Sequence, residues 1–578
     1  MIYYLNKTTL ANGWMPTPHP HDPNPYSEYG VLYRKSIGNY VTFPELISPA
    51  LLDCAKRLNL VIVFTMKPAI LDGIIKGLSR TQTELRFTDG SQLQVTESLD
   101  TMQAVNVKKY QYAALVRQER MLLVWHDDLA QVVPTATRLE EKLLTLVWGG
   151  GLPFGRLGGG TSRTPSMYST GTSVLKGVGE KGTPLGPPPG TPGGGMTGPL
   201  GASQGNESSE ALEKDESVDA PESLARPVMR TSAMFVGMGM TLAIVLLFGT
   251  FISELLIECT VDGTYTRLGL IVCVPFLLFV STFFFNVIFT NIFQIVGPIG
   301  GQHTNSRFYS CIKPSMRRAY QDGFTAPHIT IQMPVYKEGM ESVIIPTVRS
   351  LQAAISFYES HGGSASIFIN DDGLRIISEE EAQKRIDFYH DNQIGWVSRP
   401  KHGQDGFIRK GKFKKASNMN FALNISQKVE KYMQEMVDAR QQQGGSDMID
   451  EQEEHDLYRM ALKRVLEENP LAQADGNIRM GEYILIVDSD TRVPVDCLLY
   501  GAAEMFLSPE VAIVQHSTGV MQVSWDYFEN GITFFTNMVY TAIRFSIGSG
   551  EVAPFVGHNA FLRWQGTSPS LLTITPYQ

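Results

Sequence analysis

The sequence contains little cysteine and no excess of positive charge, and each shortage excludes a class of protein. Its 578 residues include five cysteines, and no two have the Cys-x-x-Cys spacing of a metal or redox site. A small, odd and scattered set of cysteines indicates reduced thiols in a protein that faces the cytosol. The formal net charge of −9 argues against nucleic acid as the main partner. The first residues lack a charged segment followed by an apolar run, so we expect no signal peptide.

Two long apolar segments, 232–257 and 268–293 within 231–298, indicate a membrane protein. Each is longer than the roughly 20 residues that a helix needs to cross a bilayer. A buried core hairpin is the alternative, but helices of globular proteins rarely stay apolar on every side over such a length. Basic residues flank the pair on its outer sides: Arg226, Arg230, Arg307, Lys313, Arg317 and Arg318. The connecting loop holds Glu258, Asp262 and Arg267, so the positive-inside rule places both large flanking regions in the cytosol.

Residues 1–148 are predicted to form a separate N-terminal α+β domain. The pattern predicts a strand at 59–66, hairpins at 83–97 and 110–127, and an amphipathic helix at 136–148. Asp89-Gly90 supplies the turn of the first hairpin, between two alternating runs. The region shows no catalytic constellation, so its role and its protein partner stay open.

Residues 149–230 are predicted to form a disordered linker. The stretch GTPLGPPPGTPGGGMTGPLGASQG is rich in Gly and Pro, and an acidic run, NESSEALEKDESVD, follows it. Such a composition cannot bury enough apolar surface to fold.

Residues 328–564 alternate between strand and helix patterns. The expected strands lie at 328–336, 365–373 and 483–490. A helix at 341–361 is expected to kink at Pro346, and the charged segment 435–475 is predicted to be a surface insertion that contains a helix. Strands separated by helices indicate an α/β domain with a parallel or mixed sheet.

Three of these strands end in acidic or polar residues. The ends read Tyr336-Lys337-Glu338, Asp371-Asp372 and Asp488-Ser489-Asp490. Ligands of open α/β sheets bind at the carboxyl ends of the strands, so these side chains are expected to meet in one crevice. Asp-x-Asp suits a hard divalent cation, which would bridge a diphosphate and neutralise its developing charge. A surface turn with two solvated acids is the alternative.

Five segments together resemble a known enzyme family. They are PVYKEG, FINDDG, SRPKHGQDGFIRKGKFKKASNMNFAL, VDSDTRVP and VGHNAFLR, in this order between about 328 and 563. The chain resembles membrane-bound family 2 glycosyltransferases, and most closely their fungal polysaccharide-synthase-like members. It is similar, more distantly, to hyaluronan, cellulose and chitin synthases. The resemblance implies a GT-A fold, a Rossmann-like mixed sheet that binds a nucleotide sugar, over 328–564.

The resemblance also implies roles for individual residues. The donor-binding residues would be Pro334, Tyr336, Glu338, Asp371, Asp372, Lys415, Asn418, Asn420 and Asp488. Asp490, together with Asp488, would hold Mg²⁺ or Mn²⁺, and Asn559 and Arg563 would lie on the acceptor side. Two points stay open. Either Asp371 or Asp372 contacts uracil or ribose, and Lys415 could instead belong to a solvated or lipid-facing patch of five cations in RKGKFKK.

The family's catalytic base is not identified in this sequence. An inverting transfer needs a base, which the family carries in a Glu-Asp motif beyond VGHNAFLR, followed by Q-x-x-R-W. The only nearby acids, Asp526 and Glu551, stand outside such a motif. The polar segment 565–578 is expected to be an aberrant tail, either of a truncated or mis-spliced reading frame, which we favour, or of a natural half-site.

Three functions remain as hypotheses. The favoured one is an integral, multi-pass membrane enzyme, in the plasma membrane rather than the Golgi or ER, with its catalytic domain in the cytosol. It would transfer a sugar from a UDP-sugar, with inversion, onto a growing cell-surface polysaccharide. The alternatives are a catalytically incompetent membrane scaffold or nucleotide-sugar-binding protein, and an enzyme that transfers one sugar to a lipid. The aromatic segment 524–548 is expected to be either an interfacial amphipathic helix or a core helix.

Overall fold

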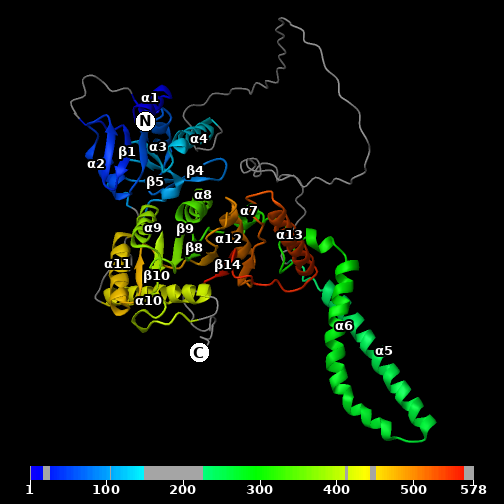
Figure 1. Cartoon of the computed structure of the whole chain (residues 1–578). Coiled ribbons are helices and arrows are strands. Elements are labelled where there is room, and N and C mark those ends of the chain that lie inside the picture. Colours follow the sequence, from blue (N-terminus) through cyan, green and yellow to red (C-terminus); the bar gives the residue numbers. More distant parts are fainter. Residues whose placement is uncertain are drawn as a thin grey trace, which may run out of the picture. The chain divides into compact units, whose positions relative to one another are not determined.

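The N-terminal region is built on a seven-stranded sheet with the strand order β2-β1-β3-β7-β6-β5-β4. In the computed structural model of the chain (Figure 1), the described residues are 2–16, 26–103, 106–148, 226–410, 414–442 and 451–564. The strands of this sheet are β1 (Val31–Ser36), β2 (Asn39–Phe43), β3 (Ile62–Met66), β4 (Glu84–Arg86), β5 (Gln92–Thr96), β6 (Ala113–Val116) and β7 (Met121–His126). The helices are α1 (Ile2–Ala11), α2 (Pro49–Arg57), α3 (Leu71–Gly77) and α4 (Leu129–Trp148), with a 3₁₀ turn, η1 (Lys109–Gln111).

The elements predicted for this region are confirmed. Strands β4 and β5 pair as an antiparallel hairpin, and so do β6 and β7. Gly90 has the positive φ of 81° that the first hairpin turn requires. The closing helix starts at Leu129, earlier than predicted, and buries one apolar stripe that includes Leu139 and Leu143.

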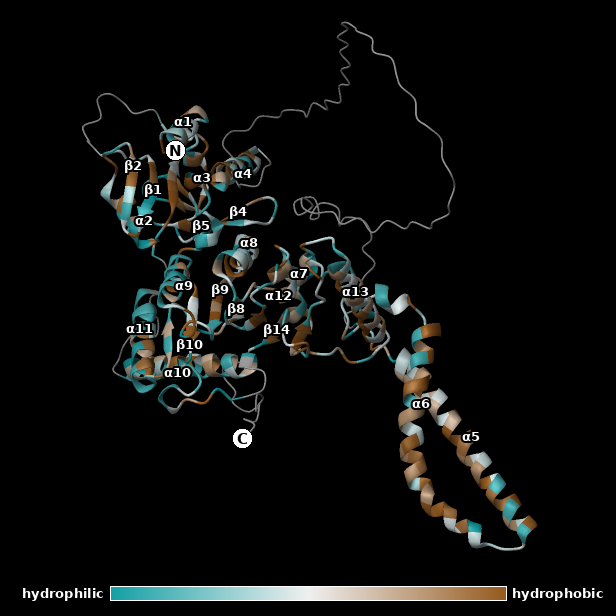
Figure 2. Cartoon of the chain, viewed as in Figure 1, coloured by the Kyte–Doolittle hydropathy of each residue, from teal (hydrophilic) through white to brown (hydrophobic). Residues whose placement is uncertain are grey.

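The two apolar segments form long helices with exposed side chains. They are α5 (Thr231–Asp262) and α6 (Val274–Val296), and a 3₁₀ segment, η2 (Thr266–Cys273), leads into the second. Their most apolar windows have mean hydropathies of 2.2 and 2.5, yet only 6% and 0% of those windows are buried. Figure 2 shows the apolar colouring along both helices. Both are therefore long and apolar enough to cross a membrane, and the buried core hairpin is not what the described residues form.

Basic residues at the base of α5 and α6 pair with acids on or beside α12 (Cys497–Leu507). Both guanidinium Nη atoms of Arg226 bond the carboxylate of Glu504, which is 8% exposed. Arg307 Nε lies 3.2 Å from Glu510 Oε1, and Lys313 pairs with Asp496. The predicted linker extended to residue 230, but 226–230 are described and Arg226 is held by these bonds. The rest of that linker lies outside the described residues.

The C-terminal sheet has seven strands in the order β11-β10-β9-β8-β12-β14-β13. Its strands are β8 (His328–Val335), β9 (Ser364–Asp371), β10 (Gly395–Ser398), β11 (Gln473–Asp475), β12 (Tyr483–Ile486), β13 (Ile513–Gln515) and β14 (Ala560–Arg563). Strands β10, β9, β8 and β12 are parallel, whereas β11 and β14 run antiparallel to their neighbours. The predicted mixed α/β sheet and its three predicted strands are confirmed. Their apolar runs are buried on both faces, as in parallel sheets.

The helices of this region are α7 (Met316–Gln321), α8 (Ile345–Ser360), α9 (Glu379–Asp391), α10 (Lys414–Gln442), α11 (Glu451–Glu468), α12 and α13 (Tyr527–Gly548). The predicted kink at Pro346 is wrong. Pro346 is the second residue of α8, where a missing N–H costs no helical hydrogen bond, and a π-helical turn, η4 (Met340–Ile344), precedes it.

The segment 435–475 is more than a surface insertion. Its helix α11 packs on α10, and Tyr458, Ala461 and Val465 of α11 are buried in one cluster with Phe368 and Val397 of the sheet. The insertion therefore supplies part of the core beneath β9 and β10. Residues 443–450 lie outside the described part of the chain.

Candidate functional site at the carboxyl ends of the strands

Three acidic strand ends meet at one edge of the C-terminal sheet, as predicted. Val335, the last residue of β8, pairs with Asp371 at the end of β9, and its carbonyl accepts from the N–H of Asp372 at 2.8 Å. On the other side of β8, the N–H of Val487 donates to Gln332 O at 3.0 Å. The segments that follow β8, β9 and β12 therefore leave the sheet side by side.

The loops after β8 and β9 touch so closely that only glycine fits at position 373. A Cβ added there would lie 1.4 Å from the carbonyl oxygen of Tyr336. Tyr336 is 42% exposed, and the Glu338 carboxylate turns back to accept from the Tyr336 N–H at 2.5 Å. Pro334 is partly buried in β8, opposite Asn370. Of these three predicted donor residues, Tyr336 presents the most open side chain.

Asp371 is fully buried and bound by protein groups. Its oxygens accept from Arg385 Nη1 at 3.0 and 3.1 Å, from the Tyr389 hydroxyl at 2.8 Å and from Gly373 N–H at 2.9 Å. Burial raises the pKa of Tyr389 well above its usual value, so this hydroxyl stays a donor. Arg385 also donates to the carbonyls of Tyr336 and Glu338. Asp371 therefore orients the arginine that holds the loop after β8.

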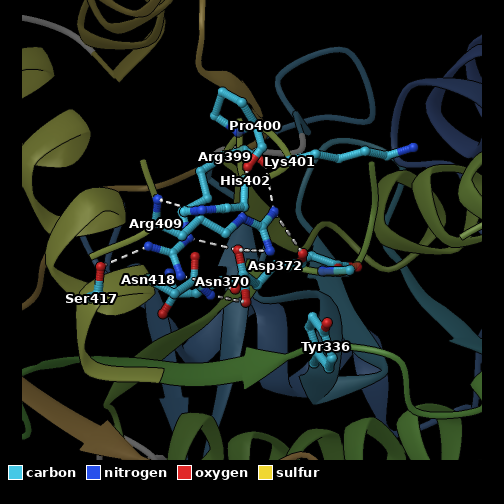
Figure 3. Close-up of polar contacts among 12 residues, drawn as sticks. Tyr336, Asn370, Asp372, Arg399, Pro400, Lys401, His402, Arg409, Ser417 and Asn418 are labelled. Atoms are coloured by element: carbon cyan, nitrogen blue, oxygen red, sulfur yellow. Dashed lines mark hydrogen bonds and ion pairs between the residues drawn. The ribbon is translucent and has the colours of Figure 1, made fainter. Parts of the chain in front are cut away.

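Asp372 lies between two buried arginines (Figure 3). Arg399 donates to its two oxygens at 2.7 and 3.0 Å, and Arg409 Nη1 lies 3.2 Å from Oδ1. Arg409 also donates to the carbonyls of Pro400 and Asp372, and Arg399 donates to Ser417 on α10. The predicted contact of Asp371 or Asp372 with a nucleoside stays a prediction, because both carboxylates have arginine partners here.

Beside this pair lies a buried group of amide and hydroxyl side chains that the sequence analysis missed in part. Asn418 Nδ2 donates to Asn370 O at 2.8 Å, while Asn420 is exposed on the other side of α10. Several side-chain atoms lack a hydrogen-bond partner among the described residues: Gln332 Nε2, both terminal atoms of Asn370, Ser398 Oγ and Asn418 Oδ1. Buried polar atoms are nearly always paired in proteins, so these atoms have unused capacity for water or a polar ligand. A polar residue inside an apolar strand, as in HITIQMPV, is the signal that would have found Gln332.

Asp488 lies between two side chains that come from different parts of the chain. Lys415, in the first turn of α10, forms an ion pair with Oδ1, and His558 Nδ1 lies 3.8 Å from Oδ2. Asp488 is about one-third exposed, with a side-chain exposure of 32%. His558 adjoins Asn559 in VGHN and was not predicted as a site residue. The structure therefore brings together Lys415 and Asp488, which were each predicted to bind the donor, and adds an imidazole beside them.

The acids fit a metal that arrives with a phosphate better than a resident ion. In the described part of the chain, no group of three or more His, Cys, Asp or Glu side chains is suited to hold a metal. Asp490 is exposed, and Asp488 has one oxygen on Lys415. Mg²⁺ commonly binds through one or two carboxylates plus waters and substrate phosphates, which matches this donor set.

Asn559 and Arg563 lie at opposite ends of β14. Asn559 precedes the strand with a φ of 50° and donates to Thr518 at 3.1 Å, and its Oδ1 is unpaired among the described residues. Because β14 is antiparallel to β12, Ala560 pairs with Ile486 but Arg563 pairs with Tyr483, at the start of β12. The structure thus does not bring Arg563 to the other predicted residues.

Arg563 instead holds the end of α12. Its guanidinium donates to Met505 O at 2.6 Å and to Ser508 O, and it lies over the Tyr483 ring at 5.3 Å. The two acids considered near the end of the chain also have structural partners. Asp526 caps α13 by accepting from the N–H groups of Phe528 and Glu529, and Glu551 accepts from the Ser232 hydroxyl. The predicted tail, 565–578, lies outside the described residues.

The two ends of the chain match two different family models. Residues 1–153 match the model described as Domain of unknown function (DUF7928). No curated protein matches the chain. Residues 483–570 match the model described as Glycosyl transferase family group 2. This second match begins at β12 and includes Asp488, Asp490, His558 and Asn559, so the C-terminal part of the chain is similar to family 2 glycosyltransferases over this segment.

Proposed function

We propose that the chain is a membrane-bound family 2 glycosyltransferase with a GT-A fold. It takes a sugar from a UDP-sugar at the carboxyl ends of β8, β9 and β12 and transfers it with inversion onto a growing cell-surface polysaccharide. The observation that carries the proposal is the arrangement at the end of β12. There, Asp488 is flanked by Lys415 and His558 beside the exposed Asp490, within the segment that matches the family.

Each side chain of this arrangement has a proposed task. Asp490 and Asp488 hold Mg²⁺ or Mn²⁺, which when bound would neutralise negative charge on the diphosphate leaving group. Lys415 moves its ammonium from Asp488 to the donor diphosphate, because a phosphate oxygen offers it a stronger charge partner. The exposed Tyr336 ring lies where a base could stack after β8. The buried Asn370 and Asn418 provide polar atoms that lack a hydrogen-bond partner among the described residues.

Three helices support the proposed membrane location. Helices α5 and α6 expose apolar side chains over their length. The end of α13 packs on their base, where Phe545 lies 5.4 Å from Phe293 between ring centroids. Aromatic side chains are exposed just before α13 and in its first half: Trp525, Tyr527, Phe528, Phe534 and Phe535. This exposure favours the interfacial helix over the core helix, because Trp and Tyr are preferred at the membrane–water boundary. A cytosolic catalytic domain at the plasma membrane is part of the proposal.

A nucleotide-sugar-binding protein without transferase activity is the second candidate. It is favoured by the structural roles of Asp526 and Glu551, the two acids near the end of the chain that were considered as a base. Transfer of one sugar to a lipid would use the same donor site, and product analysis distinguishes it from polymer synthesis.

The test is binding of UDP to the purified full chain with and without Mn²⁺, measured by calorimetry. Binding is expected to need the metal and to be lost in Asp490→Asn. The matched control is Asp438→Asn, an exposed acid on α10 far along the chain from the strand ends. Equal metal-dependent binding by Asp490→Asn and the unaltered chain would refute the site. Binding with no turnover of UDP-sugars would leave the second candidate.

A further inference from the structure

The N-terminal sheet and the C-terminal sheet belong to one compact unit, and partly buried polar contacts join them at the end of α9. Asp391, the last residue of α9, accepts from both Nη atoms of Arg34 at 3.3 Å and from Asn59 Nδ2 at 3.0 Å. Its carbonyl accepts from Lys109 Nζ at 2.9 Å, and the Tyr110 hydroxyl donates to Asn392 O at 2.7 Å. Four side chains of the N-terminal region thus converge on two residues.

The contact continues onto α8 and into the core. Tyr110 is 7% exposed and belongs to the apolar cluster of the C-terminal sheet, with Val348 and Leu351 of α8. Gln111 Nε2 donates to Glu359 O at 2.8 Å at the end of the same helix. A tyrosine that completes the core of another sheet indicates a fixed docking, because its removal would leave a cavity.

The charged side chains at this contact stabilise one another. Lys109 is 4% exposed, and burial lowers its pKa, since few groups here replace its hydration. Asp391 ends α9, where the helix dipole disfavours a carboxylate. Arg34 and Lys109 place two cations at that helix end and reverse its unfavourable electrostatics. The sequence of α9 therefore suits a helix whose end is covered by the N-terminal region.

Helix α9 also carries the residues that set the loop after β8. Tyr389 and Arg385 lie two and six residues before Asp391 on one helix of 13 residues. Arg385 bonds Asp371 and the carbonyls of Tyr336 and Glu338, as described above. A shift of the C-terminal end of α9 would therefore move Arg385 and displace the loop after β8 that Arg385 holds.

We propose that the N-terminal region is a positioning platform for the donor loop, Tyr336 to Gly339, and acts through α9. Arg34, Asn59 and Lys109 are its positioning residues, and none of them touches the site directly. The expected effect on donor affinity rests on the proposed function. The coupling of the N-terminal region to the loop through α9 does not. It gives the domain of unknown function a task within this chain.

The test compares Asp391→Ala with Asp387→Ala in the full chain. Asp387 is exposed on the same helix and, among the described residues, accepts a hydrogen bond from Gln383 four residues before it, so it controls for the loss of an acid from α9. Hydrogen exchange is measured at the amides of 336–339 and 372–376, and UDP affinity is measured with Mn²⁺. In Asp391→Ala, we expect faster exchange at both segments and UDP affinity reduced on the order of tenfold, as for loss of a charge-assisted hydrogen bond. Asp387→Ala is expected to match the unaltered chain.

Faster exchange at 109–112 with unchanged exchange at 336–339 would overturn the proposal, because the contact would then open without moving the loop. If the unaltered chain binds no UDP, the proposed function fails, and the exchange result alone still decides the coupling. If Asp391→Ala does not fold, Asp391→Asn and Arg34→Gln replace it. Asp391→Asn keeps an acceptor for Arg34 and Asn59, so its loop exchange and UDP affinity are expected to lie between those of Asp391→Ala and the unaltered chain. A purely structural role would leave loop exchange unchanged in every folded variant.

Discussion

Lys415 and Asp488 form an ion pair across the candidate site, between the first turn of α10 and the end of β12. If Asp488 is a metal ligand, the ammonium group and the metal compete for the same carboxylate oxygen. Lys415→Gln is therefore expected to raise the affinity for Mn²⁺ in the absence of nucleotide and to lower the affinity for UDP. Each change is expected to be about tenfold, the contribution of one surface-exposed charge contact to phosphate. Manganese titration by electron paramagnetic resonance and calorimetry with UDP measure the two effects.

Lys410 is the matched control for this lysine, since it lies in the same basic run. Lys410→Gln should leave both affinities unchanged. If Lys415→Gln also changes neither, Lys415 belongs to the solvated or lipid-facing patch that the sequence left open.

Removal of Asp372 is expected to destabilise the chain strongly. Its loss leaves Arg399 and Arg409, which are 1% and 5% exposed, without their shared carboxylate. Breaking a buried ion pair in this way costs about 3–5 kcal/mol. The unfolding temperature of Asp372→Ala should fall by several degrees, whereas that of Asp490→Ala, which removes an exposed acid, should not change. An unchanged unfolding temperature in Asp372→Ala would show that water replaces the carboxylate.

The closeness of the two loops predicts intolerance at Gly373. Ala at this position would place its Cβ against the Tyr336 carbonyl, so one loop must move. We expect Gly373→Ala to lower the unfolding temperature and to abolish UDP binding. Gly531 in α13 has open space around it, and Gly531→Ala should leave binding intact and favour the helix by about 1 kcal/mol. Normal UDP affinity in Gly373→Ala would contradict the loop geometry.

Glu359 predicts a dependence of stability on pH. Burial raises its pKa from 4.5 to about 8, although Lys108 and the N–H groups of Tyr110 and Gln111 oppose the rise. Between these values the folded chain holds a proton that the unfolded chain has released, so the contribution of Glu359 to stability falls as pH rises from about 4.5 to about 8 and is constant above. Glu359→Gln removes this dependence.

The measurement is the unfolding temperature of both forms from pH 5 to pH 9. The variant is expected to gain stability relative to the unaltered chain as pH rises to about 8. A constant difference across this range would mean that Glu359 titrates normally.

The sequence predicts local features of the site. It does not predict contacts between segments that lie far apart in the chain. The convergence of Tyr336, Asp371 and Asp488 could be predicted because each follows an apolar strand of a parallel sheet. Arg385 and Arg399 were missed, since nothing in their local pattern shows which carboxylate they will meet. Arg563 looks like a neighbour of Asn559 in the sequence, but four residues along an extended strand reach about 13 Å and carry it to the other end of the sheet.

The ion pairs between the base of the apolar hairpin and α12 have a consequence for the proposed membrane location. The cations Arg226, Arg307 and Lys313 that set the proposed orientation are the same groups that bond Glu504, Glu510 and Asp496. Helix α12 follows Asp488 and Asp490 in the chain, so, under the proposed membrane location, the same charges would set both the orientation of the hairpin and the distance of the candidate site from the lipid. Under this proposal, substitutions of these cations that invert the hairpin are expected also to release α12 and the strand ends from the base of the hairpin.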